Sequence, residues 1–225
     1  MNLGHHAMLK FPDRPGSGII STSRFVYGQV YPEPMENPAD RGYSILKPAA
    51  PIASLRRVPT ITGESADLTR FPARQGFEDI VQLVSDPDVD VAWTAVTFPR
   101  HRYVWFALKD PKVLSSTIFW LSNGGRHYSP WNGRHLGVMG LEEVTSYFHQ
   151  GLSASARSNP FSRSGYRTRH TLDARRVLMV NYIMAVAKIP SGFRRVRSIK
   201  LDNDKVCLVS NRGHRVTAPI AISML

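Results

Sequence analysis

Apolar and polar residues alternate over short stretches along most of the chain. A period of two, in stretches rich in β-branched and aromatic residues, is typical of strands with one buried face. The stretches cover residues 19–31, 80–84, 89–98, 103–108, 117–122, 196–201, 206–209 and 216–222. Helical periodicity is weak, and only one or two helical turns are expected, around residues 143–150. The pattern predicts an all-β fold, a β-sandwich of mainly antiparallel strands that forms a single domain over residues 1–225.

The residues between these stretches predict how the strands connect. Asp-Pro, Pro-Arg-His and Asp-Pro breaks separate the four stretches between residues 80 and 122, which indicates a meander. Residues 19–31 are expected to form one strand or a hairpin. Tight turns at 202–204 and 211–214 should join the last three strands. Seven prolines between residues 32 and 74 predict a long, irregular connection that lies over the sheet.

The composition excludes several classes of protein. With 42% hydrophobic and 20% charged residues in 225, the chain can bury a sizeable core and is not disordered throughout. Cys207 is the single cysteine, so an intramolecular disulfide and a cysteine-based zinc site are excluded. The longest apolar run, residues 177–189, is interrupted by Asn181 and Lys188 and is too short for a transmembrane helix. The first residues lack the pattern of a secretory signal, so a cytoplasmic location away from membranes is expected.

The formal net charge of +12 raises the question of an anionic partner. The arginines form short clusters that are far apart in sequence, at 56–57, 175–176 and 194–197. No nucleic-acid-binding motif accompanies them. We therefore interpret the charge as a dispersed surface property and expect no specific nucleic-acid partner. An acidic or phosphorylated sugar is the alternative that the surplus of arginines leaves open.

The segment from residue 120 to residue 143 has the densest set of candidate ligand-binding groups. Hydrogen-bonding and aromatic side chains alternate there with glycines at 124, 125, 133, 137 and 140, which are expected to let the backbone turn. This mixture suits a carbohydrate ligand, and the expected substrate-binding residues are Asn123, Arg126, His127, Trp131 and His135. Trp93, Trp105 and Trp120 lie in apolar strands and are expected in the core. A metal held by His127, His135 and Glu142 matches no known ligand spacing, so no metal is predicted.

Glu142 follows a short apolar run, residues 138–141, that predicts a buried strand. A carboxylate at the inner end of such a strand is a candidate general base. The structural alternative is a carboxylate paired with Arg126 or Arg134. Glu143 should point the opposite way and be solvated.

Residues 2–9, Asn-Leu-Gly-His-His-Ala-Met-Leu, resemble the histidine-bearing strand of aldose 1-epimerases, the galactose mutarotases. Residues 138–142, Val-Met-Gly-Leu-Glu, resemble the strand that presents the glutamate of that family. Residues 102–106 and 117–120 resemble strands that lie between these two sites. The resemblance implies a β-supersandwich that opens and closes a sugar ring by acid/base chemistry, with Glu142 as base, His6 as acid and no cofactor. Neighbouring residues on a strand face opposite ways, so of His5 and His6 only His6 is expected in the pocket.

The resemblance also implies differences from the family. Its histidine strand lies in mid-chain, whereas here it begins at residue 2, so N-terminal strands are expected to be missing and an exposed sheet edge could form a homodimer. Glu78 or Asp79 lies roughly where the family has a further acidic residue. The same fold occurs in accessory domains of glycoside-processing enzymes. A non-catalytic carbohydrate-binding domain and a sugar-phosphate epimerase are therefore kept as alternatives to a mutarotase.

Overall fold

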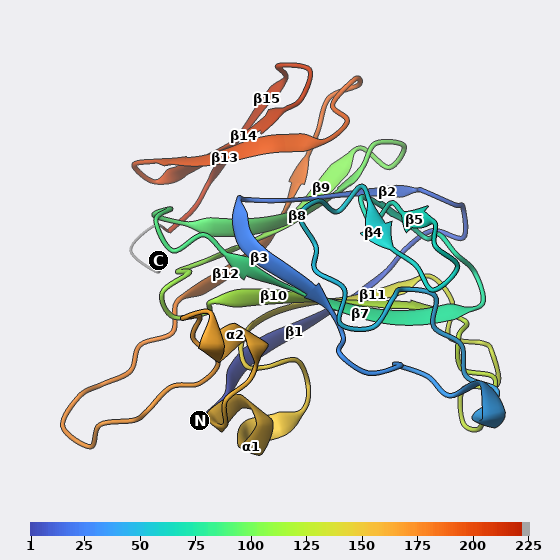
Figure 1. Cartoon of the computed structure of the whole chain (residues 1–225). Coiled ribbons are helices and arrows are strands. Elements are labelled where there is room, and N and C mark those ends of the chain that lie inside the picture. Colours follow the sequence, from blue (N-terminus) through green and yellow to red (C-terminus); the bar gives the residue numbers. More distant parts are fainter. Residues whose placement is uncertain (222–225) are drawn as a thin grey trace.

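Three antiparallel β-sheets lie one on another in the computed structural model, which describes residues 1–221 (Figure 1). Sheet A contains, in order, β1 (Leu3–Lys10), β11 (Val138–Thr145), β10 (Ser116–Asn123), β7 (Phe77–Ser85) and β3 (Phe25–Val30). Sheet B contains β12 (Tyr182–Lys188), β9 (Tyr103–Lys109), β8 (Ala92–Phe98), β2 (Gly18–Thr22) and β6 (Arg70–Phe71). Sheet C contains β13 (Val196–Asp202), β14 (Lys205–Ser210) and β15 (Arg215–Pro219). The predicted all-β sandwich is confirmed.

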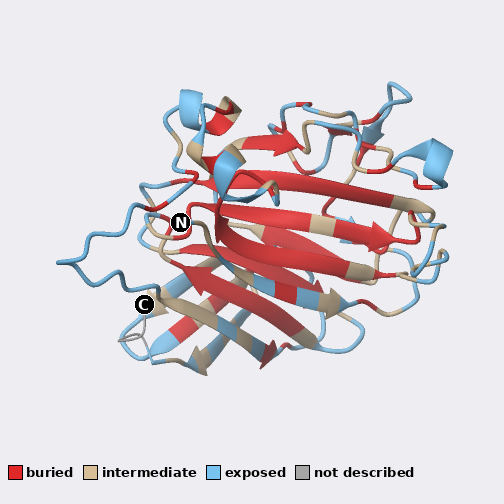
Figure 2. Cartoon of the chain, turned by 90° about the horizontal axis from the view of Figure 1, so that it is seen from below, coloured by how far each residue is buried: buried red, intermediate tan, exposed pale blue. Residues whose placement is uncertain are grey.

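Two apolar layers hold the sheets together. Phe98, Trp105 and Phe119 belong to the layer between sheets A and B. Trp93 and Phe106 belong to the layer between sheets B and C. Sheet B is therefore covered on both faces, which explains why β8 is buried along its whole length instead of alternating. Figure 2 shows that buried residues run along most of the length of several strands. The prediction that Trp93 and Trp105 are core residues is confirmed.

The connections differ from the prediction because the chain crosses between sheets. β2 lies in sheet B and β3 in sheet A, so residues 19–31 form no hairpin. β7 and β10 pair with each other in sheet A while β8 and β9 form a hairpin in sheet B, so the predicted meander is wrong. The crossings occur at the Asp-Pro breaks. Asp86 and Asp110 each accept a hydrogen bond from the amide two residues on, and the following proline cannot donate to a ladder, so the chain turns out of the sheet.

The proline-rich connection is irregular, as predicted. It contains a 3-10 helix, Pro38–Asp40, and the two-residue strands β4 (Val58–Pro59) and β5 (Ser65–Ala66). The end of the predicted last strand, Ile222, lies outside the described residues.

Two short helices, α1 (Gly151–Ala156) and α2 (Pro160–Arg163), lie near the face of sheet A that points away from sheet B (Figure 1). We call this the outer face of sheet A. Tyr147, Phe148 and Phe161 pack there against Ile80 and Ile118. The helical turn predicted at 143–150 is wrong, because residues 143–145 complete β11 and the helix begins at Gly151. Within residues 1–221, the helices are all too short to cross a membrane.

Candidate functional site

His6 and Glu142 lie opposite each other in the β1–β11 ladder, and their side chains share the outer face of sheet A. His6 Nδ1 lies 2.9 Å from Glu142 Oε1. The His6 side chain is 51% exposed and that of Glu142 only 12%. The pair therefore joins a sheltered carboxylate to an imidazole that solutes can reach. Neither Arg126 nor Arg134 is within ion-pair distance of Glu142.

Burial raises the pKa of Glu142, and the neighbouring His6 offsets only part of this rise. A carboxylate with a raised pKa binds a proton more strongly than a solvated one does and is a better general base near neutral pH. The two atoms of the pair are thus suited to exchange protons with a third group on the same face.

Gly140 leaves no room for a side chain beside the pair. A Cβ atom at this position would lie 2.9 Å from Glu142 Oε1, 3.2 Å from Trp120 Cβ and 3.3 Å from His6 Cε1. A glycine inside a strand weakens it and often marks a close approach of another group. The prediction of a turn at Gly140 is wrong, because it lies within β11; Gly124, Gly133 and Gly137 have positive φ angles, as the prediction requires.

Arg126 lies between two tryptophans. Its Cζ atom is 5.1 Å from the centre of the Trp120 ring and 5.3 Å from that of Trp131. Arg126 Nε is 2.6 Å from Glu36 Oε1, and Nη1 is 3.8 Å from Glu78 Oε1. Burial alone would lower the pKa of Arg126, but the two carboxylates outweigh it and raise the pKa. The guanidinium charge is therefore already neutralised by the protein itself.

Glu78, Ser122 and His135 form a chain of hydrogen bonds. Trp120 Nε1 donates to Glu78 Oε1 at 2.6 Å, and Ser122 Oγ donates to Glu78 Oε2 at 2.8 Å. His135 Nδ1 lies 2.6 Å from the same Ser122 oxygen. A hydroxyl has one proton, which Glu78 receives, so His135 Nδ1 must be the donor of the last bond. This network assigns the tautomer and leaves His135 Nε2 as the acceptor of the neutral ring.

The pKa values along this chain shift in opposite directions. Burial raises the pKa of Glu78, with its hydrogen bonds and Arg126 acting against the rise. Burial also lowers the pKa of His135, and the positive charges of Arg126 and Lys10 add to the fall. Both groups are thereby held closer to their uncharged forms than in water.

Two of the predicted substrate-binding residues do not join the cluster of side chains around Trp120. Asn123 donates to the Ala73 carbonyl and accepts from the Gly137 amide, so its side chain fixes loop backbone instead of pointing to the outer face. His127 is exposed and makes an edge contact with Tyr43. Arg126, Trp131 and His135 do gather beside Trp120, since the Trp131 and His135 rings are 5.3 Å apart.

Trp120 is not a core residue, which corrects the prediction. Its indole faces outward, donates to Glu78 and lies 5.5 Å from the ring of His149. Other groups that the sequence analysis did not assign to the site are Glu36, Ser122 and His149. Residues 120, 122, 140 and 142 share one face of sheet A by alternation, and this spacing was the available signal for Trp120 and Ser122. The partners of Arg126 come from distant loops and have no such signal.

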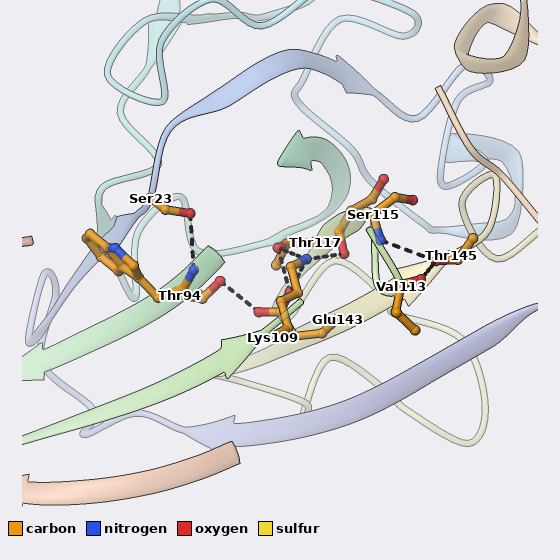
Figure 3. Close-up of polar contacts among 10 residues, drawn as sticks. Ser23, Thr94, Lys109, Val113, Ser115, Thr117, Glu143 and Thr145 are labelled. Atoms are coloured by element: carbon orange, nitrogen blue, oxygen red, sulfur yellow. Dashed lines mark hydrogen bonds and ion pairs between the residues drawn. The ribbon is translucent and has the colours of Figure 1, made fainter. Parts of the chain in front are cut away.

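Glu143 lies on the other face of β11, between sheets A and B. Its side chain is 1% exposed, so the prediction that it is solvated is wrong. Glu143 Oε2 is 2.5 Å from Lys109 Nζ, and Thr94 and Thr117 each donate to the carboxylate at 2.7 Å (Figure 3). Lys109 also donates to the Ser116 carbonyl at 2.6 Å. Glu143 is therefore a structural carboxylate.

Residues 1–221 contain no group of three or more histidine, cysteine or acidic side chains arranged to hold a metal ion. A cavity of about 580 Å³ lies between sheets B and C and includes neither His6 nor Glu142. The chain matches no protein-family model, curated protein or solved structure. The geometry of His6, Glu142 and their neighbours on the outer face of sheet A is therefore the basis for a function.

Proposed function

We propose that the chain acts on an uncharged sugar as an aldose 1-epimerase-like isomerase, with Glu142 as base and His6 as acid. The observation that carries this proposal is the 2.9 Å pair of a sheltered carboxylate and an accessible imidazole on the outer face of sheet A. Anomer interconversion requires two groups of opposite task within reach of one ring, and this pair supplies both.

The proposed reaction balances without a cofactor. Glu142 takes the proton of the C1 hydroxyl, the C1–oxygen electrons form the aldehyde, and the bond from C1 to the ring oxygen breaks. His6 gives its proton to that ring oxygen. After rotation about the C1–C2 bond, the hydroxyl formed from the ring oxygen attacks the other face of C1; His6 takes back the proton of this hydroxyl, and Glu142 returns its proton to the aldehyde oxygen. The enzyme thus ends in its starting protonation state.

The surroundings favour a neutral sugar over a sugar phosphate. Trp120 and Trp131 place aromatic surface near the outer face of the kind that contacts pyranose rings, and the Arg126 guanidinium lies against both indoles. Arg126 is already paired with Glu36 and Glu78, so it offers no net positive charge to a phosphate. A phosphate would also meet the carboxylates of Glu36 and Glu78 beside this guanidinium, and these would repel an anion.

A non-catalytic carbohydrate-binding domain would use the same aromatic faces, and the test must separate it from the isomerase. The relaxation of α-glucose and α-galactose optical rotation is measured with the wild type and with Glu142→Gln. Since general base catalysis contributes about a hundred- to ten-thousand-fold, the variant should lose catalysis by about that factor while sugar binding persists.

Glu64→Gln is the matched control, because it makes the same chemical change in an exposed turn. It should leave the rate unchanged. Sugar binding without any catalysed relaxation by the wild type would instead establish the binding domain.

A further inference from the structure

Arginines from four separate chain segments converge on one cavity. The cavity has a volume of about 210 Å³ and lies where the edge of sheet B meets the β14–β15 turn of sheet C. The arginines around it are Arg56, Arg70, Arg194, Arg195 and Arg212. This convergence corrects the interpretation of the charge as dispersed, since the clusters at 56–57 and 194–197 meet here although those at 175–176 do not.

Within residues 1–221, none of the five arginines has a carboxylate within ion-pair distance. Asp67 is the one acidic residue that lines the cavity, and its Oδ1 atom already accepts hydrogen bonds from the Thr69 amide and hydroxyl. The lining therefore has a formal charge of +4, a concentration of like charge that costs free energy unless an anion offsets it.

The backbone around the cavity is fixed. The Arg195 amide donates to Asn211 Oδ1 and the Asn211 amide donates to the Arg195 carbonyl, which ties the two segments together. The Arg56 and Arg212 amides donate to the hydroxyls of Ser54 and Ser210. The arginine side chains thus extend from rigid positions, a condition for selective binding of a small ligand.

A second hollow continues the basic surface. It has a volume of about 280 Å³, shares Arg56 and Arg195 with the first, and adds Arg197. The positive charge therefore extends beyond the reach of a single phosphate group. Guanidinium groups bind phosphate oxygens through paired N–H bonds, so several of them in one hollow suit linked phosphates.

We propose that this cavity is a binding site for a small oligophosphate, that is, a ligand with two or three linked phosphate groups. The site is on the far side of sheet B from the outer face of sheet A and is independent of the proposed acid/base chemistry. The small volume of the cavity and the fixed backbone favour a small ligand over an extended polyanion.

Calorimetric titration with inorganic tripolyphosphate, pyrophosphate and monophosphate tests the site at about 0.15 M ionic strength, where diffuse surface attraction is screened. Tripolyphosphate should bind saturably with one molecule per chain, and monophosphate should bind more weakly. The double variant Arg194→Ala/Arg195→Ala should weaken tripolyphosphate binding by about tenfold or more, because it removes charge-assisted hydrogen bonds.

Arg175→Ala/Arg176→Ala is the matched control, since it removes the same charge from a fully exposed segment outside the cavity. It should change the affinity by less than about twofold. If the first variant does not fold, the single variants Arg56→Ala and Arg212→Ala, at exposed positions, take its place. Equal weakening by the two double variants, or no saturable binding, would overturn the proposal. A single-stranded oligonucleotide that binds more tightly than tripolyphosphate would also overturn it in favour of nucleic acid.

Discussion

Glu142 and Glu143 are neighbours on β11, yet they occupy opposite chemical environments. Glu142 faces outward beside an exposed imidazole. Glu143 faces inward, where Lys109, Thr94 and Thr117 satisfy its carboxylate (Figure 3). The alternation of a strand is enough to separate a carboxylate with access to solutes from one that fastens two sheets together. Residue type alone does not distinguish them; the partners on each face do.

Of the two glutamates, Glu143 should contribute far more to the stability of the fold. Glu143→Gln should lower the free energy of unfolding by about 3–5 kcal/mol, because it leaves the Lys109 charge buried without its partner. Glu142→Gln should cost at most about 1 kcal/mol, because its partner is half-exposed. Urea denaturation of the two variants measures both values. Replacing the pair together, as Lys109→Met/Glu143→Leu, should recover much of the loss. Similar losses of stability in the two single glutamine variants would show that Glu142 and Glu143 do not differ in environment as described.

Adding a side chain at Gly140, on the outer face of sheet A, should have a smaller effect on stability than Glu143→Gln. Gly140→Val places carbon atoms where a Cβ alone would be 2.9 Å from Glu142 Oε1, so the carboxylate and Trp120 must move. We expect a loss of about 1–3 kcal/mol in urea denaturation, together with loss of sugar binding. Val138→Ile, on the same face of the same strand, is the control and should retain binding. Unchanged sugar binding by Gly140→Val would show that the ligand does not approach β11 at Gly140.

The smallest effect concerns the pH dependence of stability. Because the folded-state pKa of Glu142 is raised above its ordinary value of 4.5, the folded protein binds this proton more tightly than the unfolded chain does. The resulting stabilisation is present below about pH 4.5 and is lost as pH rises through the folded pKa. The free energy of unfolding of the wild type relative to Glu142→Gln should therefore fall as pH rises from 4.5 towards 7. A difference that is independent of pH, or that rises, would contradict the sheltered setting of Glu142.

Local patterns predicted the strands, because alternation and β-branched residues report on a single strand and its burial. They did not predict which strands pair. The Asp-Pro breaks after β7 and β9 read as turns of a meander, whereas the chain crosses there to the other sheet. Whether a break is a hairpin or a crossing depends on partners far away in sequence.

For the candidate site too, the sequence predicted the features that depend on one strand and missed those that depend on distant residues. His6 and Glu142 share one face by strand alternation, because they lie opposite each other in the β1–β11 ladder. The burial of Glu143 depends on Lys109, which comes from another sheet. Asn123 has a polar side chain typical of a binding residue, but loop backbone occupies it. The arginine cavity, likewise, forms only when four segments fold together.

Magnetisation exchange between the anomeric protons of glucose and of galactose tests most directly whether Glu142 acts on a ligand and Glu143 does not. The exchange is measured by NMR for the wild type, Glu142→Gln and Glu143→Gln at a temperature at which all three are folded. Exchange should be accelerated by the wild type and by Glu143→Gln, and with Glu142→Gln it should not exceed the rate in buffer. Equal acceleration by the wild type and Glu142→Gln would show that Glu142 is not the base.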